Sequence, residues 1–171
     1  MKLKIMNILE SITEVSQEVY QEIKSNYRDS RLIMSEDSEI VFKSRPDQKA
    51  GPKPRGLWYG IGSSWIDWVR MEMPDWEVDN VFKVDINESR VKIIRTYEEI
   101  LEFDKQYGFD MERYMGWRTI DWVSVAEDWG GIEIAPYIYE ARMKLNWYYG
   151  WDVASGCIWS DGVVKNIQKI G

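Results

Sequence analysis

Hydrophobic residues near the start of the chain recur at helical spacing. Within residues 5–27 the apolar positions lie three or four residues apart, and Glu and Gln occupy the positions between them. The apolar positions are Ile5, Ile8, Leu9, Ile12, Val15, Val19 and Ile23. This spacing puts one apolar stripe along an α-helix and predicts an N-terminal amphipathic helix over residues 5–27.

The next segments alternate between extended and irregular patterns. Glu39–Lys43 (EIVFK) predicts a short strand, and residues 44–55, with three prolines and a glycine, predict a long loop. A strand is expected over Gly56–Gly60 (GLWYG). Ser63 or Ser64 can then cap a helix that the following proline ends.

The middle of the chain predicts a hairpin followed by a helix. The β-rich runs Val81–Ile86 and Val91–Thr96 flank a short polar turn, which is typical of a hairpin. Thr96–Glu99 (TYEE) is a capping box, so a helix should open there and end near Gly108.

A second helical unit runs from Thr119 to Gly130 and precedes a strand over residues 132–135. Near the end, CIW and VVKNIQKI flank an Asp-Gly turn at Asp161–Gly162, which predicts a terminal hairpin. Helices and hairpins interleave, so the prediction is an α+β fold with a mixed or antiparallel sheet, an N-terminal amphipathic helix and a C-terminal β-hairpin. Residues 1–171 are expected to form a single compact domain.

Composition restricts the cellular location and the partners that we expect for this protein. The single cysteine, Cys157, excludes an intramolecular disulfide framework, and the first residues lack the apolar run of a signal peptide. No window approaches the roughly 18 apolar residues needed to cross a bilayer. We therefore expect a cytoplasmic protein with no membrane partner. A net charge of −7 disfavours duplex nucleic acid as a partner.

The chain contains no histidine, which limits its chemistry. Ser-His-Asp and Cys-His nucleophilic systems and two-histidine phosphodiesterases are excluded, since each needs an imidazole to move a proton. One cysteine without histidine also argues against a zinc site, so no metal is expected. Cys157 has no Lys or Arg in its own stretch and is interpreted as a buried, small apolar residue.

Aromatic residues and glycines gather with a few polar residues in the stretches 53–65, 130–137 and 147–159. Such stretches suit either the core or a cleft in which a ring-bearing ligand stacks. In the cleft interpretation the ligand-contacting candidates are Arg55, Trp58, Tyr59, Tyr137 and Trp151. The basic segment Lys43–Arg55 is either a solvated loop or the rim of a pocket for an anion.

Two carboxylates interrupt these apolar stretches. Asp152 follows Trp151, so it either faces outward or is buried with a partner. Glu133 lies between two isoleucines, and on a strand its side chain points opposite to theirs. If the isoleucines face the core, Glu133 faces solvent, a helix-covered side or a cleft wall, where it would stabilise a developing cation or hold a ribose hydroxyl.

The terminal sequence SGCIWSDGVVKNIQKI resembles the closing hairpin of small ADP-ribosyltransferase-fold domains. The opening is also similar: a strand EIVFKSR that ends in arginine, the GLWYG strand, and serines at the start of a helix. The order Arg45, Ser63 or Ser64, Glu133 is similar to the arginine–serine–glutamate branch of that family. The chain departs from it in having Gly131 where a Glu or Gln precedes the glutamate, and in placing its serines at a helix start instead of on a strand.

The resemblance implies NAD-dependent ADP-ribosyl transfer to a protein or small-molecule acceptor, with NAD as co-substrate. Arginine would bind the phosphates, serine would brace the nicotinamide pocket, and glutamate would assist the loss of nicotinamide. The catalytic candidates are then Glu133, Asp152 and Ser155, with Arg45, Ser63 and Ser64 as NAD contacts.

Two non-enzymatic alternatives stay open. One is an acidic cytosolic binding or inhibitor protein, of viral or accessory type, that uses an aromatic patch on a basic partner. The other is sugar or nucleotide binding on tryptophan platforms without chemistry. Convergence of Arg45, Glu133 and Asp152 on one concave site favours the enzyme, whereas dispersed charges with an exposed aromatic patch favour the binding protein.

Overall fold

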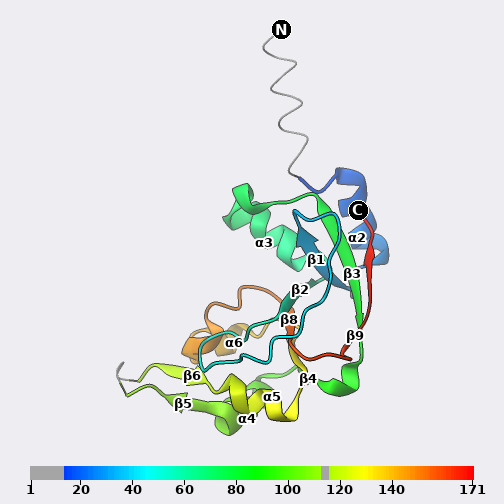
Figure 1. Cartoon of the computed structure of the whole chain (residues 1–171). Coiled ribbons are helices and arrows are strands. Elements are labelled where there is room, and N and C mark those ends of the chain that lie inside the picture. The colour runs from blue at the N-terminus through cyan, green and yellow to red at the C-terminus, as the bar shows by residue number, and fades with distance from the viewer. Residues whose placement is uncertain (1–13, 113–115) are drawn as a thin grey trace. The chain divides into compact units, whose positions relative to one another are not determined.

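The computed structural model describes residues 14–112 and 116–171 (Figure 1). The chain divides into two compact units: residues 1–41, 59–85 and 166–171 form the first, and residues 42–58 and 86–165 form the second. Both units combine helices with strands that are mostly antiparallel, which confirms the α+β class. The sequence predicts a single compact domain, which requires the two units to associate. That association stays a prediction.

Antiparallel strands form the sheet of the first unit, in the order β2–β1–β3–β9. Their bounds are Arg31–Ser35 for β1, Leu57–Ile61 for β2, Asn80–Ile86 for β3 and Val164–Lys169 for β9. The first unit contains only part of β2, residues 59–61, and part of β9, residues 166–169. The register pairs Met34 of β1 with Val81 of β3, so Leu32, Met34 and Val81 share one face.

Two helices pack against that face of the first unit. They are α2 (Gln17–Asn26) and α3 (Ser64–Glu72), and the short 3₁₀ helix η1 (Pro74–Trp76) follows α3. Their core is aliphatic, since Ile23 of α2 and Ile66 of α3 are fully buried against Leu32 and Val81. Helix α3 therefore has its inner side anchored on the sheet.

The second unit has a three-stranded sheet in the order β4–β7–β8. The strands are β4 (Val91–Ile94), β7 (Gly131–Ile134) and β8 (Ser155–Ile158), with β4 parallel and β8 antiparallel to β7. A separate antiparallel pair joins β5 (Gly108–Asp110) to β6 (Arg118–Ile120).

Short helices supply the rest of the second unit. They are η2 (Glu88–Arg90), α4 (Tyr97–Tyr107), α5 (Trp122–Asp128), α6 (Tyr139–Arg142) and η3 (Asn146–Tyr148). Both hydrogen bonds of the predicted capping box open α4, which ends at Tyr107, next to Gly108, as expected. Helix α5 begins at Trp122 because the Asp121 carboxylate accepts hydrogen bonds from the backbone N–H groups of Val123 and Ser124.

The core of the second unit is built from aromatic rings. Trp122 lies at its centre, within 6.3 Å ring to ring of Phe103, Trp147, Trp151 and Trp159. Each of these side chains is at most 2% exposed. Most of the aromatic stretch 147–159 therefore belongs to the core, which also accepts Ile132, Ile134 and Cys157 from the sheet.

The N-terminal helix is shorter than the prediction of residues 5–27. Residues 5–13 lie outside the described residues, and residues 14–16 are not helical. The helix begins at Gln17 because the Ser16 hydroxyl accepts a hydrogen bond from the backbone N–H of Val19. Only the C-terminal part of the predicted helix is confirmed.

The strand predicted over Glu39–Lys43 is wrong, because that segment forms no strand and Val41 is 69% exposed. The strand of this region lies earlier in the chain, as β1, whose short apolar run had not been recognised between polar residues. Leu32 of β1 pairs with Gly60 on one side and Lys83 on the other. Backbone pairing on both edges stabilises this segment, and Glu39–Lys43 lacks such partners.

Both predicted hairpins have the right strands and the wrong pairing. β3 pairs with β1, and β4 runs parallel to β7, so these two strands do not form a hairpin across residues 87–90. Likewise β8 pairs with β7 while β9 lies beside β3. A local turn signal records a change of direction but does not identify the hydrogen-bonding partner.

Gly62 provides a test of the loop between β2 and α3. Its φ of 55° lies in the left-handed region, and a Cβ there would overlap the carbonyl oxygen of Arg28. We expect Gly62→Ala to lower the free energy of unfolding by about 2 kcal/mol, part of it from the left-handed backbone. Gly116→Ala is the control, since Gly116 has a φ of 76° but open space around its Cβ position. Urea denaturation should show about half the loss there, and equal losses would contradict the role of the contact.

Candidate functional site

Glu133 and Ser155 lie on opposite faces of the second unit's sheet. The register pairs Ser155 with Ile134 and Glu133 with Gly156. Directly opposed residues share a face, so Ser155 lies on the core face with Ile134 and Glu133 on the other. Ile132 and Ile134 do face the core, and Glu133, on the other face, is only 5% exposed and does not face solvent. These two catalytic candidates are not brought together.

Asp152 lies in the loop before β8 and has a cationic neighbour. Its side chain is 24% exposed, and one carboxylate oxygen is 3.9 Å from Nη2 of Arg142. The Ser155 hydroxyl donates to the carbonyl oxygen of Val153 at 3.0 Å, so this hydroxyl has a structural hydrogen bond. Asp152 is thus half-buried beside a cation, which lies between the two alternatives that the sequence left open.

Arg45 and Arg55, the two arginines predicted to contact the ligand, share one carboxylate. Arg45 donates to both oxygens of Asp47, at 2.9 and 3.0 Å, and Arg55 donates to Asp47 at 2.7 Å. The hydrogen bonds from Arg45 and then Arg55 hold the pKa of Asp47 well below its usual range. Gln48 closes the loop by bonding the backbone of Arg45 and Arg55. The basic segment is therefore an ordered loop whose arginines are already paired.

The predicted aromatic contacts of the second unit are mostly core residues. Trp58 meets Trp151 edge to face at 4.9 Å, and Trp151 is 1% exposed with its indole N–H donating to the carbonyl of Pro52. Tyr137 stacks on buried Tyr148 at 5.3 Å. These rings fill the interior, and their arrangement supports the core alternative for the aromatic stretches.

The remaining candidates belong to the first unit. Tyr59 is 3% exposed on β2. Ser63 precedes α3 and donates its hydroxyl to Asp67 at 2.7 Å, while the Ser64 hydroxyl accepts from the backbone N–H of Ile61. Both serines therefore shape the start of α3.

Cys157 is fully buried on β8, as its interpretation as a small apolar residue predicted. Burial raises the pKa of its thiol well above the ordinary value, against a weaker opposing effect of Arg45. The folded protein at pH 8 should therefore react with a thiol-specific reagent at least about tenfold more slowly than the protein in denaturant. An absorbance assay with and without guanidinium chloride measures both rates, and equal rates would contradict the burial.

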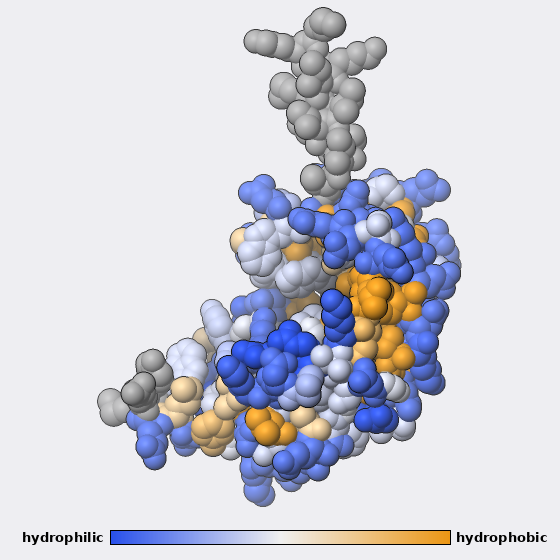
Figure 2. Space-filling view, viewed as in Figure 1, coloured by the Kyte–Doolittle hydropathy of each residue, from blue (hydrophilic) through white to orange (hydrophobic). Residues whose placement is uncertain are grey.

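A tryptophan face that sequence reasoning had missed lies on the first unit. Trp65 and Trp68 stack at 5.0 Å on α3, and Trp76 of η1 lies 6.5 Å from Trp68. Trp76 is 56% exposed and Met71 is 75% exposed. We call these four residues the tryptophan face. Figure 2 shows pale surface, which marks residues of intermediate hydropathy, over α3, with strongly hydrophilic surface beside it.

A buried ion pair fixes η1 against α3. Arg70 donates from Nε and Nη2 to the Glu77 carboxylate, with a shortest distance of 2.7 Å, and Glu77 is 5% exposed. Glu77 also accepts from the backbone N–H of Val15, and Arg70 lies over the ring of Tyr20. Trp76 precedes Glu77 directly, so its exposed ring is held by a well-packed support.

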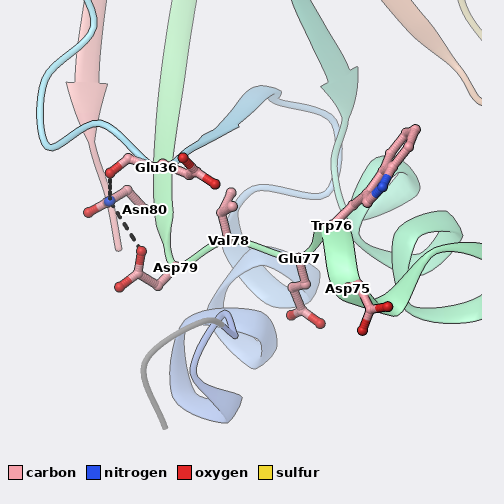
Figure 3. Close-up of a pocket in the computed structure, with 7 residues that line it drawn as sticks. All are labelled: Glu36, Asp75, Trp76, Glu77, Val78, Asp79 and Asn80. Atoms are coloured by element: carbon pink, nitrogen blue, oxygen red, sulfur yellow. Dashed lines mark hydrogen bonds between the residues drawn. The ribbon is translucent and has the colours of Figure 1, made fainter. Parts of the chain in front are cut away.

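An open pocket of about 690 Å³ lies along the same segment (Figure 3). Its lining is formed by Glu36 and the consecutive residues 75–80. Figure 3 shows the Trp76 indole pointing away from the carboxylates of Asp75 and Glu77. The segment thus has an aromatic side and an acidic side.

A second exposed aromatic patch surrounds α6 in the second unit. Tyr139 is 76% exposed, Met143 is 80% exposed and Tyr149 is 54% exposed. Arg142 lies 4.9 Å over the Tyr149 ring, which ties the two ends of this patch together. We call these residues the α6 patch.

The described residues, 14–112 and 116–171, contain neither a cluster of metal ligands nor a membrane-spanning helix. No group of three or more Cys, Asp or Glu side chains there is placed to hold a metal ion. No helix in that part of the chain is long and apolar enough to cross a membrane. Comparison with protein-family models, curated proteins and solved structures found no match to this chain.

Proposed function

We propose that this protein is a non-catalytic binding protein that engages its partner through the tryptophan face. The observation that carries the proposal is the exposure of Trp76 and Met71 beside two stacked indoles. Tryptophan is enriched among the residues that dominate binding energy at interfaces, and exposed apolar patches rimmed by polar residues mark interaction sites. The inner side of α3 is anchored on the sheet by Ile66, whereas Met71 of the same helix is 75% exposed.

The placement of the catalytic candidates favours binding over transfer. Glu133 and Ser155 lie on opposite faces of one sheet, and Arg45 and Arg55 are paired with Asp47. ADP-ribosyl transfer with NAD as co-substrate stays a prediction. Incubation with NAD tests it: nicotinamide release above background that Glu133→Gln abolishes would support transfer and count against a purely binding role.

Selection from a random peptide library on the immobilised protein tests the binding proposal. Enriched peptides should bind the wild type and lose at least about tenfold in affinity for Trp76→Ala, because an exposed anchor contributes strongly to such contacts. They should bind Tyr149→Ala, a matched change in the α6 patch, as tightly as wild type.

Two outcomes would overturn the proposal. One is the absence of enriched peptides, and the other is equal binding by wild type and Trp76→Ala. Trp76 is 56% exposed, so its removal should leave the fold intact, and circular dichroism of the variant checks this.

A further inference from the structure

The negative charge of the protein is concentrated in one unit. Residues 1–41, 59–85 and 166–171 hold 8 Lys and Arg against 14 Asp and Glu, a net charge of −6. The second unit holds 14 against 15, a net charge of −1. The tryptophan face therefore belongs to the acidic unit, whereas the α6 patch belongs to a nearly neutral one.

Carboxylates flank the tryptophan face without compensating cations. Glu72 lies four residues after Trp68, which puts it one helical turn along the same side of α3. Asp75 directly precedes Trp76, with its carboxylate on the other side of the segment from the indole (Figure 3), and both Glu72 and Asp75 are exposed. Among the described residues neither carboxylate forms an ion pair. Arg70, the cation of α3, is already bound to Glu77.

The acidic side of the same segment adds further negative charge. Glu36 and Asp79 line the open pocket beside Asp75, and the Asp79 carboxylate accepts a 3.2 Å hydrogen bond from the Asn80 side chain (Figure 3). A partner that lies across residues 75–80 meets indole on one side and carboxylates on the other.

We propose that the tryptophan face takes a basic segment of a partner protein, one whose Lys or Arg side chains lie on the indoles and pair with the flanking carboxylates. This rests on the proposed binding function and names its partner class. Cations are attracted to the face of an indole ring, and complementary charge accelerates association. A neutral partner would lose both effects, and an acidic partner would also meet repulsion from the unit's net charge of −6.

Synthetic peptides that differ only in the state of their lysines test this inference. One version carries lysine, a second acetyl-lysine, which keeps the stem but removes the charge, and a third glutamate. Tryptophan fluorescence should show the lysine version binding the wild type at least about tenfold more tightly than the acetylated version at low salt. The advantage should shrink as salt is added, because exposed charges are screened.

Two double variants separate the effect of the carboxylates near the tryptophan face from the effect of the protein's net charge. Glu72→Gln with Asp75→Asn should weaken the lysine peptide about three- to tenfold and leave the acetylated peptide unchanged. Glu102→Gln with Glu127→Gln removes the same charge from exposed positions of the second unit and should change binding less than about twofold.

The outcomes distinguish the two proposals. If the peptides bind in a manner that depends on Trp76 but the lysine and acetyl-lysine versions bind equally, the face is a binding surface and the basic partner is wrong. Equal weakening by the two double variants would also overturn the local pairing. If no version binds in a way that Trp76→Ala abolishes, the proposed function itself fails.

Discussion

Replacing Trp122 with alanine is expected to lower the free energy of unfolding by about 4 kcal/mol, the largest effect of any single substitution considered for this protein. Trp122 has no exposed surface and contacts Phe103, Trp147, Trp151 and Trp159. Its indole N–H also donates to the carbonyl oxygen of Gly51 at 2.9 Å, which ties the loop before β2 to α5. Truncation leaves a cavity bounded by rigid rings that cannot close over it.

Urea denaturation followed by far-ultraviolet circular dichroism measures this loss. Trp117→Ala is the matched control, because Trp117 is in the same unit but is 51% exposed. The control should lose less than about 1 kcal/mol. Similar losses for the two variants would show that Trp122 does not organise the core.

The second large effect concerns a buried carboxylate. Asp104 is 7% exposed and accepts hydrogen bonds from Nε of Arg118 at 2.5 Å and from the indole N–H of Trp147 at 2.9 Å. Arg118 also donates to the backbone carbonyl of Asp104, so α4 and β6 are joined at this point. We expect Asp104→Ala to cost about 3 to 4 kcal/mol, because it leaves a buried indole N–H and a partly buried guanidinium without their acceptor.

Two related variants sharpen the test of Asp104. Asp104→Asn keeps an acceptor for Trp147 and should cost less than the alanine variant. Asp110→Ala removes the other carboxylate near Arg118, at 3.3 Å but 70% exposed, and should cost less than about 1 kcal/mol. Thermal and urea unfolding give the ranking, and a loss for Asp110→Ala as large as that for Asp104→Ala would contradict it.

Local signals in the sequence predicted the elements whose causes are themselves local. The capping box at Thr96 and Glu99 opens α4, and Pro74 follows the end of α3, as expected from single residues. The alternation of Ile132, Glu133 and Ile134 correctly predicted that the Glu133 side chain points opposite to both isoleucines. These features depend on residues within one helical turn or one strand, so the sequence contains them directly.

The candidate site could not be predicted in the same way. A run of aromatics has the same composition whether its rings pack together or line a cleft, and only the packing of Trp122 at the centre of the second unit decides for the core. Similarly, Arg45 and Arg55 are ten residues apart in sequence, and their sharing of Asp47 depends on how the loop closes through Gln48. The tryptophan face did have a signal, since Trp65 and Trp68 are at helical spacing, but their exposure depends on which side of α3 the sheet covers.

The sequence by itself determined the α+β class, the positions of most helices and strands, and the burial of Cys157, because capping, chain breaking and side-chain alternation act between near neighbours. The tertiary structure alone decided which strands pair, as when β3 joins β1 and β4 runs parallel to β7. It also put Glu133 and Ser155 on opposite faces and left Trp76 exposed in the acidic unit. These outcomes depend on hydrogen bonds and packing between residues far apart in the chain, where many partners are chemically equivalent until the fold selects one.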